Sequence, residues 1–281
     1  MTFPEHFEIP LADWIDALMD WVLMSYGTFF DAVGDGILQF LLYIERFFLW
    51  LPWPLVVGAV GVTAWRLMGR WWYGVIMAGL LLLIGGFGYW RLAMMTLALV
   101  AGAVLMSLAI GIPVGIVMAR NNLLESLIKP ILDAMQTMPS FVYLIPALML
   151  FGLGKVPALF ATIVYAVPPV IRLTNVGIRE VPQSVVEAAQ AFGSSSWQIL
   201  TNVQLPLARP AIMVGINQTT MMALSMVVIA SMIGARGLGL EVLLAINRIE
   251  VGRGFEAGLS IVFLAIIIDR VTHAMAARQR K

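Results

Sequence analysis

Long runs of apolar residues, separated by short polar breaks, make up most of this chain. A helix needs about 20 mostly apolar residues to cross a membrane, because each residue rises about 1.5 Å through a hydrocarbon core about 30 Å thick. The sequence therefore predicts an all-α polytopic membrane bundle of about seven transmembrane helices, over residues 53–68, 71–89, 92–118, 131–151, 156–176, 208–233 and 255–274. Prolines inside these runs are tolerated in membrane bundles, because neighbouring helices satisfy the backbone groups that they free.

The first fifty residues depart from this pattern, because they hold eight acidic residues and one arginine. Over residues 13–22, apolar side chains recur at helical spacing opposite three aspartates, and Trp14 and Trp21 suit the headgroup level. This predicts either an amphipathic helix lying on the outer leaflet or an acidic linker helix that serves only to dock. We divide the chain into an acidic outer segment (1–50), two additional spans (51–90) and a bundle core (91–281).

The basic residues predict how the chain is oriented, because Lys and Arg accumulate in the inner loops of membrane proteins. With the amino terminus outside, the alternating loops place eleven Lys and Arg residues inside and six outside. The acidic first segment also suits the outer side. We expect the amino terminus outside and the carboxyl terminus in the cytoplasm, in a multi-pass protein of the bacterial cytoplasmic (inner) membrane.

Composition supports a lipid environment and excludes several classes of site. The 281 residues are 61% hydrophobic and 12% charged, whereas soluble domains carry about 25% charged residues. A net charge of +1 gives no reason to expect a nucleic-acid partner. Since the chain has no cysteine, a disulfide framework, a Cys-ligated zinc site and a thiol nucleophile are all excluded.

One long polar segment, residues 177–207, separates the fifth and sixth predicted spans. Its sequence, GIREVPQSVVEAAQAFGSSSWQILTNVQLPL, predicts two short amphipathic helices over 183–192 and 197–203. Pro182 suits an early helical position, and Gly193 supplies the positive φ with which helices often end. The serines at 194–196 offer an N-cap for the second helix, which we expect to end near Pro206. A helix–Gly–helix elbow of this kind suits the groove of a partner.

The same segment resembles the EAA loop of the permeases of binding-protein-dependent ABC importers. The family pattern is E-A-A, three residues, G, nine residues, then I-x-L-P. The matching positions here are Glu187, Ala188, Ala189, Gly193, Val203, Leu205 and Pro206, with Val203 in place of the usual Ile. Residues 136–181 and 232–258 resemble the glycine betaine/proline/choline branch of these permeases, which favours a choline or betaine permease with a type I ABC importer fold.

The resemblance implies a coupling role for the elbow. Glu187 would contact a cytoplasmic ABC ATPase, Ala188 and Ala189 would allow close approach, and Gly193 would turn the chain. Leu205 and Pro206 would stiffen the return to the membrane. ATP and Mg²⁺ would be bound by the ATPase, of which the family uses two copies. A second copy of this permease and an outer substrate-binding protein are the other implied partners.

The substrate path is less evident in the sequence. Polar residues within spans and near helix breaks are the candidates: Gln136, Ser140, Tyr143, Tyr165, Asn217, Thr219, Thr220 and Ser225. Aromatic faces attract quaternary ammonium groups through cation–π interactions, but polar residues in spans more often bond neighbouring helices. Asp133 and Arg172 fall near the inner ends of spans, where we expect them at the interface.

The sequence does not favour an enzyme. A P-loop requires G-x-x-x-x-G-K-[S/T], and the fragment Gly154-Lys155-Val156 lacks both the first glycine and the final hydroxyl. His6 and His273 are too far apart to form a metal pair, so we expect no catalytic residue, metal or cofactor in this chain. The alternative function is an ion-gradient-driven secondary transporter, which would show two similar halves and mid-membrane ionisable residues. An intramembrane enzyme would require a nucleophile paired with a base, or a metal triad.

Overall fold

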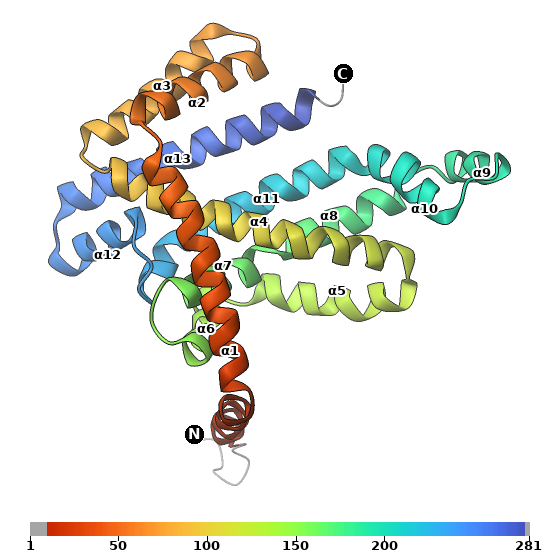
Figure 1. Cartoon of the computed structure of the whole chain (residues 1–281), viewed down its shortest axis with the longest axis horizontal. Coiled ribbons are helices and arrows are strands. Elements are labelled where there is room, and N and C mark those ends of the chain that lie inside the picture. The colour runs from red at the N-terminus through yellow and green to blue at the C-terminus, as the bar shows by residue number, and fades with distance from the viewer. Residues whose placement is uncertain (1–9, 279–281) are drawn as a thin grey trace, which may run out of the picture.

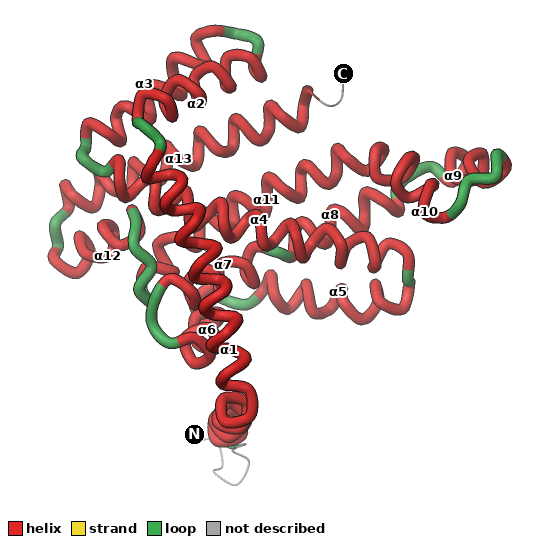
Figure 2. The backbone as a smooth tube through the Cα atoms, viewed as in Figure 1, coloured by secondary structure: helices red, strands yellow, loops and turns green. Residues whose placement is uncertain are grey.

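The computed structural model describes residues 10–278, with the backbone alone for residues 276–278. These residues form helices joined by short loops, with no strand among them (Figure 2). The order is α1 (Leu11–Trp50), α2 (Trp53–Met68), α3 (Trp71–Gly86), α4 (Trp90–Arg120), α5 (Asn122–Thr137), η2 (Ser140–Tyr143), α6 (Leu144–Phe151), α7 (Lys155–Ala166), α8 (Pro168–Arg179), α9 (Gln183–Ala191), α10 (Ser196–Ile199), the π-helical turn η3 (Leu200–Gln204), α11 (Leu205–Ser231), α12 (Leu238–Arg248) and α13 (Val251–Arg278). The predicted all-α class is confirmed.

Four helical stretches are long and apolar enough to cross a membrane: α4, α7 with α8, α10 through α11, and α13 up to Met275. They correspond to four of the seven predicted spans. Two strongly bent pairs, α1 with α2 and α5 with η2 and α6, raise the number to six if each pair counts as one span. Helices α2 and α3 have 16 residues each, about 24 Å of rise, so each is shorter than the hydrocarbon core.

The predicted span over 131–151 is not one straight helix. Helix α5 ends at Thr137, and the chain bends by 111° before α6. The break follows from Pro139, because a proline removes a backbone donor and disfavours the α conformation in the preceding residue. Met138 accordingly has ψ 135°, an extended conformation. The run of apolar residues continues across the break, which is why it resembles a single span in the sequence.

The acidic segment forms one helix of 40 residues, α1, which bends by 93° into α2 at Leu51 and Pro52. Its fully buried residues, Gly34, Ile37 and Leu41, all lie in its second half, where it packs against α4, α6 and α7. Trp14 and Trp21 are exposed. The predicted helix is confirmed from Leu11 onward, the first nine residues lie outside the described part, and its position on the outer leaflet stays a prediction.

The centre of the bundle is α8, which lies between α4 and α11 (Figure 1). Small residues allow these helices to approach closely, as is common in membrane proteins. A Cβ atom added to Gly115 of α4 would lie 2.6 Å from Cβ of Thr174 and 2.7 Å from the carbonyl oxygen of Ile171. Gly177 of α8 faces Ala208 and Ala211 of α11 in the same way. Helix α8 is therefore fixed on two sides by backbone-to-backbone packing.

This packing makes a prediction for Gly115→Ala. The new methyl group has no room, so we expect it to destabilise the protein by about 1–3 kcal/mol through overpacking. Gly79→Ala on α3 is the matched control, because no neighbouring atom lies within 4 Å of the added Cβ and both variants gain the same helix propensity. In detergent, the midpoint temperature of thermal unfolding should be clearly lower for Gly115→Ala than for Gly79→Ala. Equal midpoints would contradict the packing argument.

Candidate functional site

The elbow predicted between the fifth and sixth spans is present at one end of the bundle, at the right of Figure 1. Helix α9 ends at Ala191, and Gly193 follows with φ 79°. Its amide donates to the carbonyl oxygen of Gln190 at 2.9 Å, and the Ser194 amide donates to that of Ala189 at 3.1 Å. These bonds satisfy carbonyl groups that the end of the helix leaves free. Gly193 therefore ends α9 and turns the chain, as its position predicted.

The second helix of the elbow begins with a capping box. The Ser195 hydroxyl accepts from the Gln198 amide at 3.3 Å, and the Gln198 side chain accepts from the Ser195 amide at 2.8 Å. Each residue satisfies a donor that the helix start would leave free. The serine run was predicted to supply this cap, and Ser195 is the residue that does so.

The predicted end of this helix near Pro206 is wrong. Helix α10 continues through the π-helical turn η3 into α11, and Pro206 lies in the first turn of α11. A proline is tolerated in a first helical turn, where its missing donor has no intrahelical partner. The wider π turn also relieves the contact between the proline ring and the preceding turn. The elbow therefore joins the spanning helix α11 without a loop.

The surface of the elbow is unusually apolar for a polar segment. No residue of α9 is buried, and Glu187 and Ala188 are exposed while Ala189 is half-buried. Two large side chains beside the turn are also exposed, Phe192 at 91% and Trp197 at 67%. Large exposed apolar side chains of this kind are candidates for contact with a partner. Sequence reasoning missed Phe192 and Trp197, although both directly flank the predicted turn.

The remaining motif residues lie at the root of the elbow. Val203 and Leu205 are half-buried, and Pro206 is exposed. Leu205 packs with the cluster of Ile178, Leu200, Ala208 and Ile212, which joins the end of α8 to the start of α11. The two helices that carry the elbow are thus packed against each other at its base. The role expected for Leu205 and Pro206 in stiffening the return to the membrane stays a prediction.

The predicted path residues do not converge on one site. Tyr143 and Tyr165 meet edge to face with ring centroids 5.9 Å apart, and the Tyr143 hydroxyl donates to the carbonyl oxygen of Met135. Asn217 instead faces α13, where it donates to Asp269 at 3.3 Å and accepts from Thr272. Thr220 and Ser225 bond to carbonyl groups of their own helix. Thr219 is fully buried, Gln136 is exposed and Ser140 is half-buried in η2.

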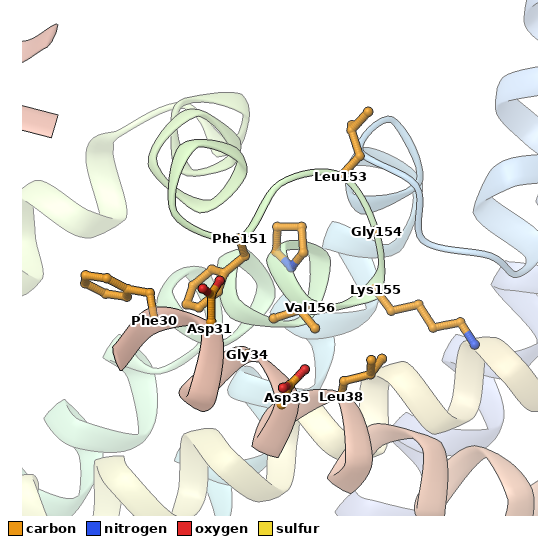
Figure 3. Close-up of a pocket in the computed structure, with 11 residues that line it drawn as sticks. Phe30, Asp31, Gly34, Asp35, Leu38, Phe151, Leu153, Gly154, Lys155 and Val156 are labelled. Carbon is orange, nitrogen blue, oxygen red and sulfur yellow. The ribbon is translucent and has the colours of Figure 1, made fainter. Parts of the chain in front are cut away.

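A cavity of about 540 Å³ lies between α1 and the α6–α7 loop (Figure 3). Asp31 and Asp35 line it from α1, and Phe151 lines it from α6. Lys155 also lines it, and its Nζ pairs with Glu45 at 2.6 Å. The Gly154 amide donates at 2.8 Å to Ile233, beyond the far end of α11. Because α11 has 27 residues and is about 40 Å long, the cavity and the elbow lie about a membrane thickness apart.

Metal binding was not expected, and the residues that the structure describes contain no group of three or more His, Asp or Glu residues able to hold a metal ion. His6 lies outside these residues. His273 lies 3.7 Å from Asp269 at the end of α13. The elbow itself presents one carboxylate, Glu187, and the exposed apolar side chains of Phe192 and Trp197.

Comparison with known proteins identifies similar sequences over nearly the whole chain. Residues 111–281 match the family model described as binding-protein-dependent transport system inner membrane component. The chain is 49% identical over 271 residues to the glycine betaine/carnitine transport permease protein GbuB of Listeria monocytogenes, covering 95% of each chain. It is 44% identical to the glycine betaine transport system permease protein OpuAB of Bacillus subtilis, covering 97% of this chain and 96% of that protein.

The fold is also found among solved structures. A chain of the inward-facing MetNI methionine ABC transporter superposes with a TM-score of 0.62 over 69% of this chain and 96% of that chain. Its sequence identity of 20% means that this likeness concerns the fold alone. The predicted type I importer permease fold is confirmed.

The elbow turn makes a local prediction for Gly193→Ala. No atom would contact the added Cβ, so the effect comes from the backbone, whose φ of 79° is unfavourable for alanine. The left-handed conformation costs an alanine about 1–2 kcal/mol. We expect faster hydrogen–deuterium exchange over residues 183–199 in the variant, with unchanged exchange in α4. Gly69→Ala, at φ 75° in the α2–α3 turn, is the control and should leave the elbow unaffected.

Proposed function

Since the chain belongs to the family of binding-protein-dependent transport system inner membrane components, we propose that it forms the membrane passage through which an ATP-driven importer carries glycine betaine into the cytoplasm. The observation that carries this proposal is the elbow α9–α10, which is exposed, apolar at its tip and joined without a loop to the spanning helix α11. An element of this shape couples a partner's movement to a membrane helix. The secondary-transporter alternative has no use for such an element.

Glycine betaine is favoured as the substrate by the relatives that share 44–49% identity along nearly the whole chain. Its quaternary ammonium group has no hydrogen-bond donor, so aromatic faces are its natural partners. Tyr143 and Tyr165, which lie beside the break between α5 and α6, are the aromatic pair that best fits this chemistry. Choline carries the same cationic group and is the second substrate to test.

The partners follow from the same proposal. Glu187, Phe192 and Trp197 would contact a cytoplasmic ABC ATPase, which binds ATP and Mg²⁺ while this chain binds neither. A single elbow engages one ATPase, so two permease copies related by a two-fold axis would serve two ATPases, with the passage between them. An outer binding protein would deliver the amine. With the elbow in the cytoplasm, the cavity beside Asp31 and Asp35 opens on the outer side. The acidic first segment lies on the same side.

Transport in reconstituted vesicles tests this proposal. The chain, its ATPase and its binding protein should take up labelled glycine betaine when ATP is present on the ATPase side. Glu187→Arg should reduce uptake by about tenfold or more, because charge reversal at a close contact costs an interface at least about 1.4 kcal/mol. Choline measured in parallel identifies the preferred amine.

Asp16→Arg is the control for net charge. It makes the same charge change on an exposed α1 residue, far along the chain from the elbow, and should retain uptake. Uptake that persists without the ATPase, or that follows an imposed ion gradient, would contradict the importer and support the secondary transporter. If uptake by Glu187→Arg equals that of the unmodified chain, Glu187 is not part of the surface that contacts the ATPase.

The subunit composition is a separate prediction. Native mass spectrometry of the purified complex should give two permease chains and two ATPase chains, because each elbow engages one ATPase. Substitution of both Phe192 and Trp197 by Ser should release the ATPase, since these side chains supply the exposed apolar area of the elbow. The permease pair should survive this change. A complex with one permease chain would contradict the two-fold arrangement.

A further inference from the structure

A row of polar contacts joins α5 to α8 beside the elbow. Arg179, the last residue of α8, makes two of them and also bonds to α4 and to its own helix. Its Nε donates to Oδ1 of Asn175 at 3.0 Å, and its Nη1 donates to Oδ1 of Asn122 at 2.8 Å. Its Nη2 donates to the carbonyl oxygen of Met118 at 2.9 Å and lies 3.0 Å from Oε2 of Glu125. One guanidinium group thus connects the ends of three helices.

Glu125 is the second centre of this row. Its Oε1 accepts from Nδ2 of Asn175 at 2.9 Å and lies 2.8 Å from Nζ of Lys129. Asn175 is 1% exposed, so the oxygen and the nitrogen of its side-chain amide both depend on these contacts, because a buried polar group without a partner is costly. The side chain of Glu125 is 15% exposed. The centre of the row is therefore satisfied and largely closed to solvent.

A further pair extends the row along the same two helices. Asp133 of α5 forms an ion pair with Arg172 of α8. On α8, the residues 172, 175 and 179 are spaced by three and four positions, so they share one face. We call Asn122, Glu125 and Asp133 of α5, with Arg172, Asn175 and Arg179 of α8, the α5–α8 polar ladder. Its contacts run from the end of α4 to the fourth turn of α5.

The position of the ladder links two parts of the molecule that are otherwise separate. Arg179 is followed by three residues and then by α9, so it stands at the entrance of the elbow. Helix α5 leads in the other direction to the break at Met138 and Pro139, where Tyr143 bonds back to Met135. Leu132 is the one fully buried residue of α5. The ladder is therefore the main directional attachment of α5 to the helix that enters the elbow.

We propose that the α5–α8 polar ladder makes α5 move together with the elbow, and that Arg179 is the positioning residue that transmits ATPase movement to the break beside Tyr143 and Tyr165. This inference rests on the proposed function. Hydrogen bonds and ion pairs are directional, so they preserve the register of two helices when one of them is displaced. Apolar contacts alone would allow α5 to slide along α8.

Arginine is suited to this position because its planar guanidinium offers five donors in a fixed fork. A lysine would keep the charge beside Glu125 but could not reach acceptors on α4, α5 and α8 in one plane. The geometry therefore predicts graded effects. Arg179→Gln should lose the coupling of ATP hydrolysis to uptake, and Arg179→Lys should retain part of it.

The ratio of uptake to ATP hydrolysis in reconstituted vesicles tests this role. Arg179→Gln should assemble with the ATPase and hydrolyse ATP, while uptake per ATP falls at least about fivefold, the lower range of ordinary coupling between sites. Arg179→Lys should lie between this variant and the unmodified chain. Lys129→Gln is the control, because it removes a partner of Glu125 within α5 and leaves every contact between helices in place.

Several outcomes would overturn the proposal. An unchanged ratio of uptake to ATP hydrolysis in Arg179→Gln would do so. A loss of hydrolysis and uptake in equal proportion, together with a lower melting temperature, would also do so, because it indicates a structural role. An equal loss in Lys129→Gln would show that the charge around Glu125 matters and the link between helices does not. If Arg179→Gln fails to fold, Glu125→Gln provides the same test, since it keeps the shape and removes the charge. Failure of the unmodified chain to import would instead refute the proposed function.

A distance measurement tests the joint movement directly. The chain has no cysteine, so spin labels can be placed at will, and Ser126 on α5 and Ser184 on α9 are both exposed. In the assembled transporter, the distance between these labels should stay constant between the nucleotide-free and ATP-bound states, with a narrow distribution. Arg179→Gln should broaden the distribution or shift it with nucleotide. A nucleotide-dependent shift in the unmodified chain would contradict the proposal.

Discussion

Lipid offers no hydrogen-bond partner to a backbone amide or carbonyl group, and this constraint shapes the whole chain. Helices satisfy these groups internally, so the helices must pack through side chains that add little directional energy. The bundle obtains tight packing by bringing helix backbones close together. Gly111 and Gly115 bring α4 against α8, and Gly177 and Gly215 bring α8 against α11. Helix α8 becomes the fixed centre on which the rest is arranged, and three residues separate its end from the elbow.

The helix breaks occur where other parts of the protein can satisfy the backbone. The α6–α7 loop is closed by the bond from the Gly154 amide to Ile233. The start of α12 is held by the buried hydroxyl of Thr96, which accepts from the Leu238 amide at 2.9 Å. Non-helical backbone at membrane depth is tolerated when protein surrounds it in this way. These contacts also join α4, α6, α11 and α12 at the end of the bundle opposite the elbow.

The sequence was most informative where local residues decide the structure. The runs over 92–118, 156–176, 208–233 and 255–274 correspond to α4, α7 with α8, α11 and α13 within a few residues, because charged or turn residues bound each run. The elbow was predicted from Gly193 and the serines, whose conformational preferences do not depend on distant segments. Pro206 was misinterpreted because a proline fits the first turn of a helix as well as the residues after one. The break at Pro139 was hidden by the apolar residues on both sides.

Contacts between distant segments could not be predicted in this way. Asn122, Glu125 and Met118 lie more than 50 positions from Arg179, and nothing in the spacing of either segment indicates that they meet. The same applies to Asn217, a predicted path residue, whose bonds to Asp269 and Thr272 on α13 could not be predicted from the sequence. In a spanning helix, one polar residue can serve packing or transport, and the difference lies in the neighbouring helix.

The tip and the root of the elbow use different physical interactions. At the tip of the elbow, Phe192 and Trp197 offer apolar surface, which is non-directional and tolerates small changes of orientation while a partner moves. At its root, Arg179 and Glu125 offer bonds with defined directions, which transmit a displacement without loss of register. In the proposed function, a compliant contact outside and a rigid one inside would allow the elbow to pivot on the ATPase while α8 and α5 move together.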